Sequence, residues 1–316
     1  MISSPMWILF AFLSPALYAV AEIFDEYLSN RGFKHISSLI FFACLLNFIF
    51  VPILFIIQPP SLPQGHLWLP VIGVGLTNLA YLYPYYRSLQ VEDTSVVSAF
   101  FSLGKIIIPA FAFLFIGEIL SLREYLGIGI IIAGNIGLAI HIKKKSIFSI
   151  FSFSERRFKL SKAFYLILMA STILAIDGIL FKYMFEQGIG WSTAVGGQLL
   201  LSGFIGCVAL LVAKKSREHI KADRKKYFRS GGIFFTEELF TFLGLAAETF
   251  AITLAPVSLV KGVGMAIPIF VLSYTVAVKR FKPENFHEDT SFWNIVRKIT
   301  IFSLIIIGLA LIGFED

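Results

Sequence analysis

The chain has 316 residues, of which 57% are hydrophobic and only 15% are charged. This composition excludes an ordinary soluble globular domain and indicates an integral membrane protein. The net charge of +7 does not indicate a nucleic-acid partner, because the basic residues lie in loops between apolar segments rather than among interleaved aromatic residues.

Ten apolar runs of about 20 residues follow one another along the chain, and each is long enough to cross the bilayer as a helix. No Lys or Arg precedes the first run, so it lacks the basic region of a cleaved signal peptide and is expected to remain as the first helix. The predicted helices are centred near Phe12, Leu46, Leu76, Lys105, Ile132, Leu174, Gly203, Phe242, Pro268 and Leu304.

The basic residues of the loops lie almost entirely on one side of this helical arrangement. Of the 27 Lys and Arg, 23 lie in every second loop, and only Arg123 lies in a loop of the other set. The positive-inside rule therefore predicts a multi-pass protein of the cytoplasmic (inner) membrane with both termini outside. The most basic loop, residues 214–229, is interpreted as an orienting loop, with an anionic-lipid or partner site as the alternative.

A polar, basic segment at residues 143–161 divides the ten runs into two groups of five, at residues 1–142 and 162–316. The two groups resemble each other weakly, since residues 14–32 align with 170–188 and residues 94–105 align with 257–268. Because each group has an odd number of helices, the two must insert with opposite orientation. The predicted fold is therefore all-α, with ten transmembrane helices in two inverted five-helix repeats joined by a cytoplasmic linker, as in many secondary transporters.

Residues 96–134 begin with a Val- and Ser-rich helix start, continue with Gly117, Glu118 and Leu120, and close with Gly127 and Gly134. This pattern resembles the EamA type of the drug/metabolite transporter superfamily, and the resemblance covers the five-plus-five organisation of the whole chain. It implies a membrane transporter. It implies no particular substrate, because that family moves amino acids, nucleosides, amines and other metabolites.

The chain departs from the family pattern in three ways. Lys105 stands where the family usually has proline, although the second half keeps this proline at Pro268. Arg280 and Phe281 stand where the second half would repeat the Gly-Glu pair. The charge pattern is also opposite to the usual orientation of the family, which places both termini inside.

Charged residues inside the predicted helices are the strongest candidates for a site, because a charge at the bilayer centre costs about 2.5–3.5 kcal/mol. Glu248 and Lys261 lie about 10 Å from a predicted hairpin turn at residues 255–256, so they are expected to form an ion pair. That pair is either structural or in contact with substrate. Lys105 lies in the middle of the fourth helix and is the leading candidate for substrate binding, the alternative being a lysine satisfied by protein groups alone.

Two polar stripes are expected to face each other across a cavity. The eighth helix carries Glu237, Thr241, Gly244 and Glu248 at helical spacing, and its repeat counterpart carries Asn78, Tyr81 and Tyr85. Tyrosines of a membrane-interface belt are the competing interpretation for Tyr83, Tyr85 and Tyr86. The predicted substrate-binding residues are Lys105, Lys261, Glu248, Glu237, Tyr81, Tyr85, Asn78, Thr241, Ser98 and Ser102.

Asp177 and Glu22 occupy nearly matching repeat positions and are the candidates for proton coupling or for the counter-ion of Lys105. Asp25, Glu26, Arg87 and Lys182 lie nearer the helix ends, where snorkelling to the interface is expected. Cys44 and Cys207 are interpreted as small buried residues, and His219 has no partner at catalytic or metal-binding spacing. The sequence therefore predicts no catalytic set, no metal and no cofactor.

The function predicted from these features is a secondary active transporter that moves a small polar metabolite by alternating access, with proton coupling as a hypothesis. The presence of both lysines and carboxylates favours a zwitterionic, amino-acid-like substrate. The alternatives are a lipid-linked phosphate carrier or flippase, and a transporter of an organic cation such as a quaternary amine. The expected partners are the substrate and membrane lipids, and nothing in the sequence indicates a homodimer.

Overall fold

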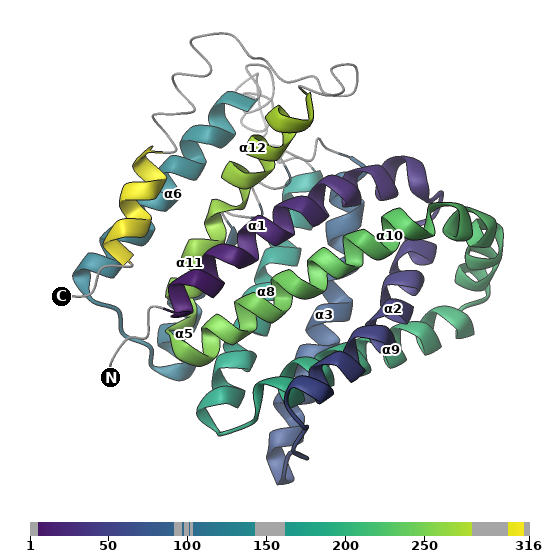
Figure 1. Cartoon of the computed structure of the whole chain (residues 1–316), viewed down its shortest axis with the longest axis horizontal. Coiled ribbons are helices and arrows are strands. Elements are labelled where there is room, and N and C mark those ends of the chain that lie inside the picture. Colours follow the sequence, from purple (N-terminus) through teal and green to yellow (C-terminus); the bar gives the residue numbers. More distant parts are fainter. Residues whose placement is uncertain are drawn as a thin grey trace, which may run out of the picture.

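The computed structural model describes residues 6–91, 97, 101, 104–142, 162–279 and 303–312, and every regular element in these ranges is a helix. The long helices pack side by side in one bundle (Figure 1). Five of the described helices are long and apolar enough to span a membrane, and shorter apolar helices lie at Ile107–Ile116, Val257–Val271 and Ser303–Ile312. Each of the ten predicted runs contains a described helix, so the predicted all-α, multi-pass membrane fold is confirmed.

The first half forms five helices in the predicted order. They are α1 (Met6–Tyr27), α2 (Ile36–Ile57), α3 (Trp68–Leu89), α5 (Ile107–Ile116) and α6 (Leu122–Ile142). A π-helical turn, Leu28–Gly32, continues α1 toward α2. The predicted linker at residues 143–161 lies outside the described residues.

The second half follows the same order with two differences. Its helices are α8 (Lys162–Glu186), α9 (Trp191–Val212), α10 (Lys214–Leu254), α11 (Val257–Val263), the 3-10 turn Gly264–Ala266, α12 (Ile267–Lys279) and the helix Ser303–Ile312. Residues 214–229, which we expected to form a loop, are the first turns of the 41-residue helix α10. Lys, Arg, Glu and Ala dominate this segment and favour helix, so the basic residues extend the spanning helix beyond its apolar part.

The main helix contacts have counterparts: replacing each helix by the equivalent helix of the other half gives another contact that is present in the structure. Helix α1 packs along α10, and their counterparts α8 and α3 pack along each other (Figure 1). Helices α2 and α9, which are counterparts of each other, also pack together, and α1 contacts α12 as α8 contacts α5. A pseudo-two-fold axis between repeats produces such paired contacts, so the packing agrees with the predicted inverted repeat.

The helices that carry Lys105 and Lys261 are both interrupted. Helix α5 begins only after a turn at residues 105–106, and the 3-10 turn Gly264–Ala266 separates α11 from α12. The physical reason in the second half is Pro268, which has no N–H to bond the carbonyl oxygen of Gly264. That oxygen instead accepts the N–H of Ile267, and it keeps a second lone pair for another donor.

Gly117 and Glu118 connect the two halves. Gly117 ends α5 in the left-handed conformation, with φ of 67°, which glycine adopts without strain. The Glu118 carboxylate then accepts the backbone N–H groups of Val257 and Ser258 at 2.9 and 3.0 Å. Glu118 therefore caps the first turn of α11, the helix that carries Lys261.

A contact at one end of the bundle joins the α1–α2 connection to the basic part of α10. The rings of His35 and His219 stack with centroids 3.8 Å apart, and Asp223 accepts a hydrogen bond from the backbone N–H of His35 and lies 3.0 Å from its Nδ1. Ser37 hydrogen-bonds His219 at 2.9 Å. His219 thus has partners that its sequence spacing did not indicate, in a contact between elements.

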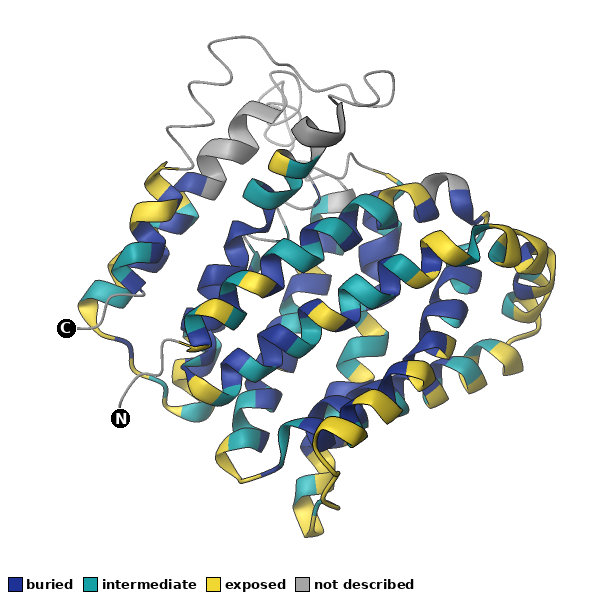
Figure 2. Cartoon of the chain, viewed as in Figure 1, coloured by how far each residue is buried: buried dark blue, intermediate teal, exposed yellow. Residues whose placement is uncertain are grey.

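The distribution of polarity is that of a protein in lipid. Many large apolar side chains face outward, whereas buried residues follow the faces where helices meet (Figure 2). Carboxylates, amides and two lysines are among the buried polar side chains of the described residues. Since each buried charge needs a partner or a wet cavity, these residues indicate where a site lies.

Candidate functional site

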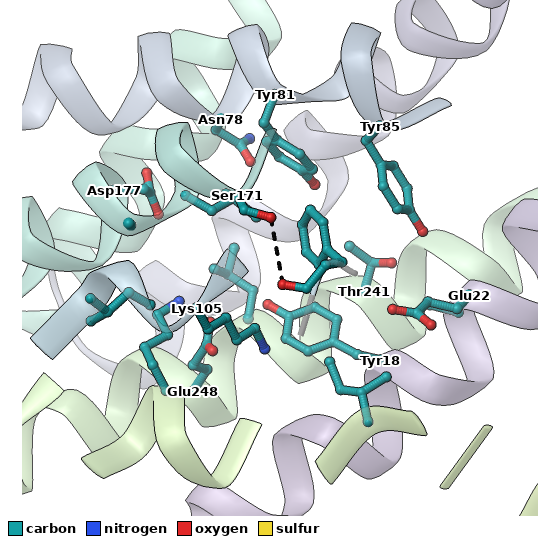
Figure 3. Close-up of a pocket in the computed structure, with 18 of the residues that line it drawn as sticks. Tyr18, Glu22, Asn78, Tyr81, Tyr85, Lys105, Ser171, Asp177, Thr241 and Glu248 are labelled. Atoms are coloured by element: carbon teal, nitrogen blue, oxygen red, sulfur yellow. Dashed lines mark hydrogen bonds and ion pairs between the residues drawn. The ribbon is translucent and has the colours of Figure 1, made fainter. Parts of the chain in front are cut away.

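A cavity of about 110 Å³ lies inside the bundle between the two halves. Figure 3 shows Asn78, Tyr81 and Tyr85 at one side, with Tyr18, Lys105 and Glu248 at the opposite side. The predicted site residues that line this cavity are Lys105, Lys261, Glu248, Asn78, Tyr81, Tyr85, Thr241, Asp177 and Glu22. Glu237 lines an adjoining cavity, and Ser98 and Ser102 lie outside the described residues.

Lys105 is held at the junction of the two interrupted helices. Its side chain is 9% exposed, and its Nζ donates to the carbonyl oxygen of Gly264 at 3.0 Å. This is the oxygen that Pro268 leaves with a free lone pair. Within the described part of the chain Lys105 forms no salt bridge, so one carbonyl dipole is its only direct partner there and two of its N–H groups remain without an acceptor.

Lys261 and Glu248 form the predicted ion pair, with Nζ and Oε2 2.7 Å apart and both side chains buried. The equal depth of the two residues on either side of the hairpin turn was sufficient to predict it. Gly264 leaves the space between this pair and Lys105: a Cβ atom there would lie 3.0 Å from Lys105 Nζ and 3.7 Å from Glu248 Oε1. The two lysines therefore share a small volume, but only Lys261 is neutralised by contact.

Asp177 is held by neutral groups rather than by a lysine. Its Oδ1 accepts hydrogen bonds from Thr77 at 2.6 Å and from Gln198 at 3.0 Å. Of the two alternative roles of Asp177, the direct counter-ion of Lys105 is not observed, because two hydrogen-bond donors from neighbouring helices orient its carboxylate, and proton coupling stays a prediction. Glu22 lines the same cavity from α1.

A second cavity of about 60 Å³ adjoins the first and is lined by Asp25, Glu237 and Glu238. The prediction that Asp25 snorkels to the interface is wrong, since its side chain is 5% exposed and accepts a hydrogen bond from the Tyr85 hydroxyl at 2.9 Å. The interpretation of Tyr85 and Tyr86 as tyrosines of a membrane-interface belt is also wrong, because both side chains are buried in the bundle.

Sequence reasoning missed several lining residues. Tyr18 lines the first cavity, and its ring lies against Gly244, whose Cβ position would be 3.0 Å from the ring. Gln198 is a single amide in an apolar run, so the rule that singled out Lys105 also applied to it. Nothing local distinguished Ser171, which lies so close to Gly104 that any side chain at that glycine would overlap it.

Comparison with known proteins agrees with this architecture. Residues 5–140 match the model of the EamA-like transporter family. The chain is 30% identical over 140 residues to a protein of Sinorhizobium sp named "Uncharacterized transporter in cobO 3'region", which corresponds to 43% of this chain and 99% of the relative. A protein of known crystal structure aligns over 98% of both chains with a TM-score of 0.65 and 14% identity, which shows a shared fold alone.

Proposed function

Because the chain belongs to the EamA-like transporter family, we propose that it is a secondary active transporter that carries a small, zwitterionic metabolite across the cytoplasmic membrane. Three features support alternating access around a central site: the cavity between the two halves, the corresponding helix contacts of those halves, and the interrupted helices beside the cavity. In the proposed orientation both termini lie outside, as the alternation of basic residues predicts.

The observation that carries the proposal is the state of Lys105. Its buried ammonium lines the cavity, has one carbonyl partner and forms no salt bridge within the described residues. A carboxylate or phosphate on the substrate would supply the missing charge, since an opposite charge offsets much of the cost of burying the ammonium. Lys261 is a weaker candidate for this contact, because Glu248 already neutralises it.

The rest of the cavity favours a zwitterion over a simple anion. Carboxylates of Glu22 and Asp177 and the aromatic rings of Tyr18 and Tyr81 line it together with Lys105. Carboxylates and aromatic faces attract cations, and the Lys105 ammonium attracts an anion. One molecule with an anionic and a cationic group can therefore interact favourably with both sets of lining residues. An amino-acid-like metabolite has this combination.

The hydrogen bond between Lys105 and Gly264 suggests how substrate binding couples to the change between the outward- and inward-facing states. The Lys105–Gly264 bond joins the interrupted helix of one half to that of the other. A substrate anion that binds Lys105 competes with the carbonyl of Gly264 for the ammonium. Binding would therefore change a contact between the halves, which gives the ligand a different affinity for the two states.

The test is thermal unfolding of the purified protein in detergent with small zwitterions, anions and cations at equal ionic strength. A ligand that binds the folded state stabilises it by about 2.7 kcal/mol at one hundred times its Kd. We expect one class that contains a carboxylate or phosphate to raise the Tm, and Lys105→Met to lose this shift. The exposed Lys215, changed to Met, is the matched control and keeps it. An equal shift in Lys105→Met, or no shift with any class, would contradict the proposal.

A further inference from the structure

The second cavity differs from the first in its charge. Asp25, Glu237 and Glu238 line it, and no lysine or arginine is among its lining residues in the described part of the chain. All three side chains are buried, with Glu237 only 1% exposed. Three carboxylates without a basic partner are costly to bury, so this cavity requires a cation or protons.

The hydroxyl groups around this cavity donate to only one oxygen of each neighbouring carboxylate. The Tyr85 hydroxyl donates to Asp25 Oδ2 at 2.9 Å, and the Thr241 hydroxyl donates to Glu237 Oε1 at 2.9 Å. The other oxygens, Asp25 Oδ1 and Glu237 Oε2, are buried and accept no hydrogen bond within the described residues. Two buried carboxyl oxygens therefore remain unsatisfied at one site.

Two side-chain amides add their carbonyl oxygens to the hydrogen-bond acceptors of this cavity. The Nδ2 groups of Asn47 and Asn78 both donate to Ser202 Oγ, at 3.2 and 3.1 Å. The Ser202 hydroxyl donates its own hydrogen to the carbonyl of Leu199, so its oxygen can only accept, which fixes the orientation of both amides. Each amide thus uses one of its two N–H donors on Ser202, and its carbonyl oxygen accepts no hydrogen bond within the described residues.

We propose that the second cavity binds a primary ammonium group, which is the cationic end of the substrate. A primary ammonium brings a positive charge, which the lining residues in the described part of the chain lack, and three N–H donors for the unsatisfied carboxylate oxygens. The neighbouring rings of Tyr81, Tyr85 and Tyr86 add cation–π attraction.

Other cations satisfy this site less well. A quaternary ammonium has the charge but no N–H donor, so Asp25 Oδ1 and Glu237 Oε2 would stay unsatisfied. A metal ion needs several ligands converging on one point, and the described residues contain no group of three acidic, histidine or cysteine side chains placed to hold one.

The position of this subsite fits a zwitterion that also contacts Lys105. Asp25, Asn78, Tyr81, Tyr85 and Thr241 line both cavities. A molecule that contacts Lys105 and Glu237 at once must be longer than an α-amino acid, because Glu237 and Glu248, the latter beside Lys105, lie about 16 Å apart along α10. The assignment of the ammonium to the substrate rests on the proposed function, whereas binding of an ammonium group at this site is measurable without it.

The experiment compares methylammonium, tetramethylammonium and sodium chlorides at equal ionic strength, with the apparent Tm of the purified full-length protein as the readout. We expect methylammonium to raise the Tm by several degrees and the other two salts to have no specific effect. Glu237→Gln should remove the methylammonium shift, and Glu238→Gln is the second variant if the first does not fold. The exposed Glu218, changed to Gln, is the matched control and should keep the shift.

An equal shift with sodium, or a methylammonium shift that persists in Glu237→Gln and Glu238→Gln, would overturn the ammonium site. The Lys105→Met protein separates this inference from the proposed function. If a carboxylate ligand binds through Lys105 but methylammonium has no effect, the ammonium site is wrong and the proposed function stands. If methylammonium stabilises both the wild type and Lys105→Met while no anionic or zwitterionic ligand binds, the ammonium site stands without the proposed substrate.

Discussion

Lys105 and Lys261 have the same side chain and line the same cavity, but their neighbours give them different properties. Lys261 lies 2.7 Å from a carboxylate, so its charge is compensated within the protein. Lys105 contacts a carbonyl dipole, which offsets only part of the cost of burying a charge. In the proposed function, Lys261 therefore serves mainly the structure of the cavity and Lys105 serves ligand binding.

The ion pair leads to a prediction for a double-mutant cycle. Lys261→Met and Glu248→Gln, made singly, should each lower the free energy of unfolding by roughly 3–5 kcal/mol, because each leaves an uncompensated buried charge. The double variant should recover most of this loss, since it leaves neither charge. Thermal unfolding of the four proteins in detergent measures the cycle. Additive losses would show that the two side chains do not stabilise each other.

At the scale of helices and turns, the site depends on interruptions. Pro268 prevents α12 from continuing the hydrogen-bond ladder into α11, and this leaves the Gly264 carbonyl available to Lys105. In the first half a turn at residues 105–106 brings Lys105 to the same junction. The two interruptions place irregular backbone inside the protein, where the cavity and the facing helix supply partners for it.

The cap on α11 provides the prediction at this scale. Glu118→Ala removes the acceptor for the N–H groups of Val257 and Ser258 and should lower the free energy of unfolding by about 1 kcal/mol. Glu118→Gln, which keeps one acceptor oxygen, should lose less. The readout is thermal unfolding, with Glu218→Ala as an exposed acidic control. A Glu118→Ala protein as stable as the control would show that α11 does not need this cap.

At the scale of the whole molecule, the helix contacts of one half have counterparts in the other half. The contact of α1 with α10 has its counterpart in the contact of α8 with α3, so a rearrangement at one pair has an equivalent at the other. Alternating access in inverted repeats uses this equivalence, because the outward- and inward-facing states are related by the same exchange. Asp177 and Glu22 lie on α8 and α1, the counterpart helices of these two pairs.

Proton coupling is therefore a prediction about the transport cycle as a whole. A buried carboxylate held by neutral donors, as Asp177 is by Thr77 and Gln198, is uncharged when it is protonated, and the two donors stabilise its negative charge when the proton leaves. Substrate accumulation in proteoliposomes should fall when a protonophore collapses the pH gradient, and Asp177→Asn should remove this dependence. Glu22→Gln tests the second candidate. Accumulation that is unchanged without a gradient would exclude proton coupling.

The all-α membrane fold and much of the candidate site were predictable from the sequence. Apolar run length determines which segments can cross a bilayer, and the energetic cost of a charge in lipid makes Lys105, Lys261 and Glu248 conspicuous. Equal depth on two antiparallel helices was enough to predict the ion pair between Glu248 and Lys261, because the rise per residue in a helix is constant.

Only the tertiary structure decided which polar groups satisfy one another. Asp25 was expected at the interface, but Tyr85 of another helix holds it inside, and Asp177 is held by α3 and α9 rather than by Lys105. Sequence patterns give the depth and face of a residue on its own helix, but not the side chain that lies opposite it. The interruption at Lys105 and the separation of the acidic cavity from the lysines depend on such contacts between helices, which no single segment of the sequence contains.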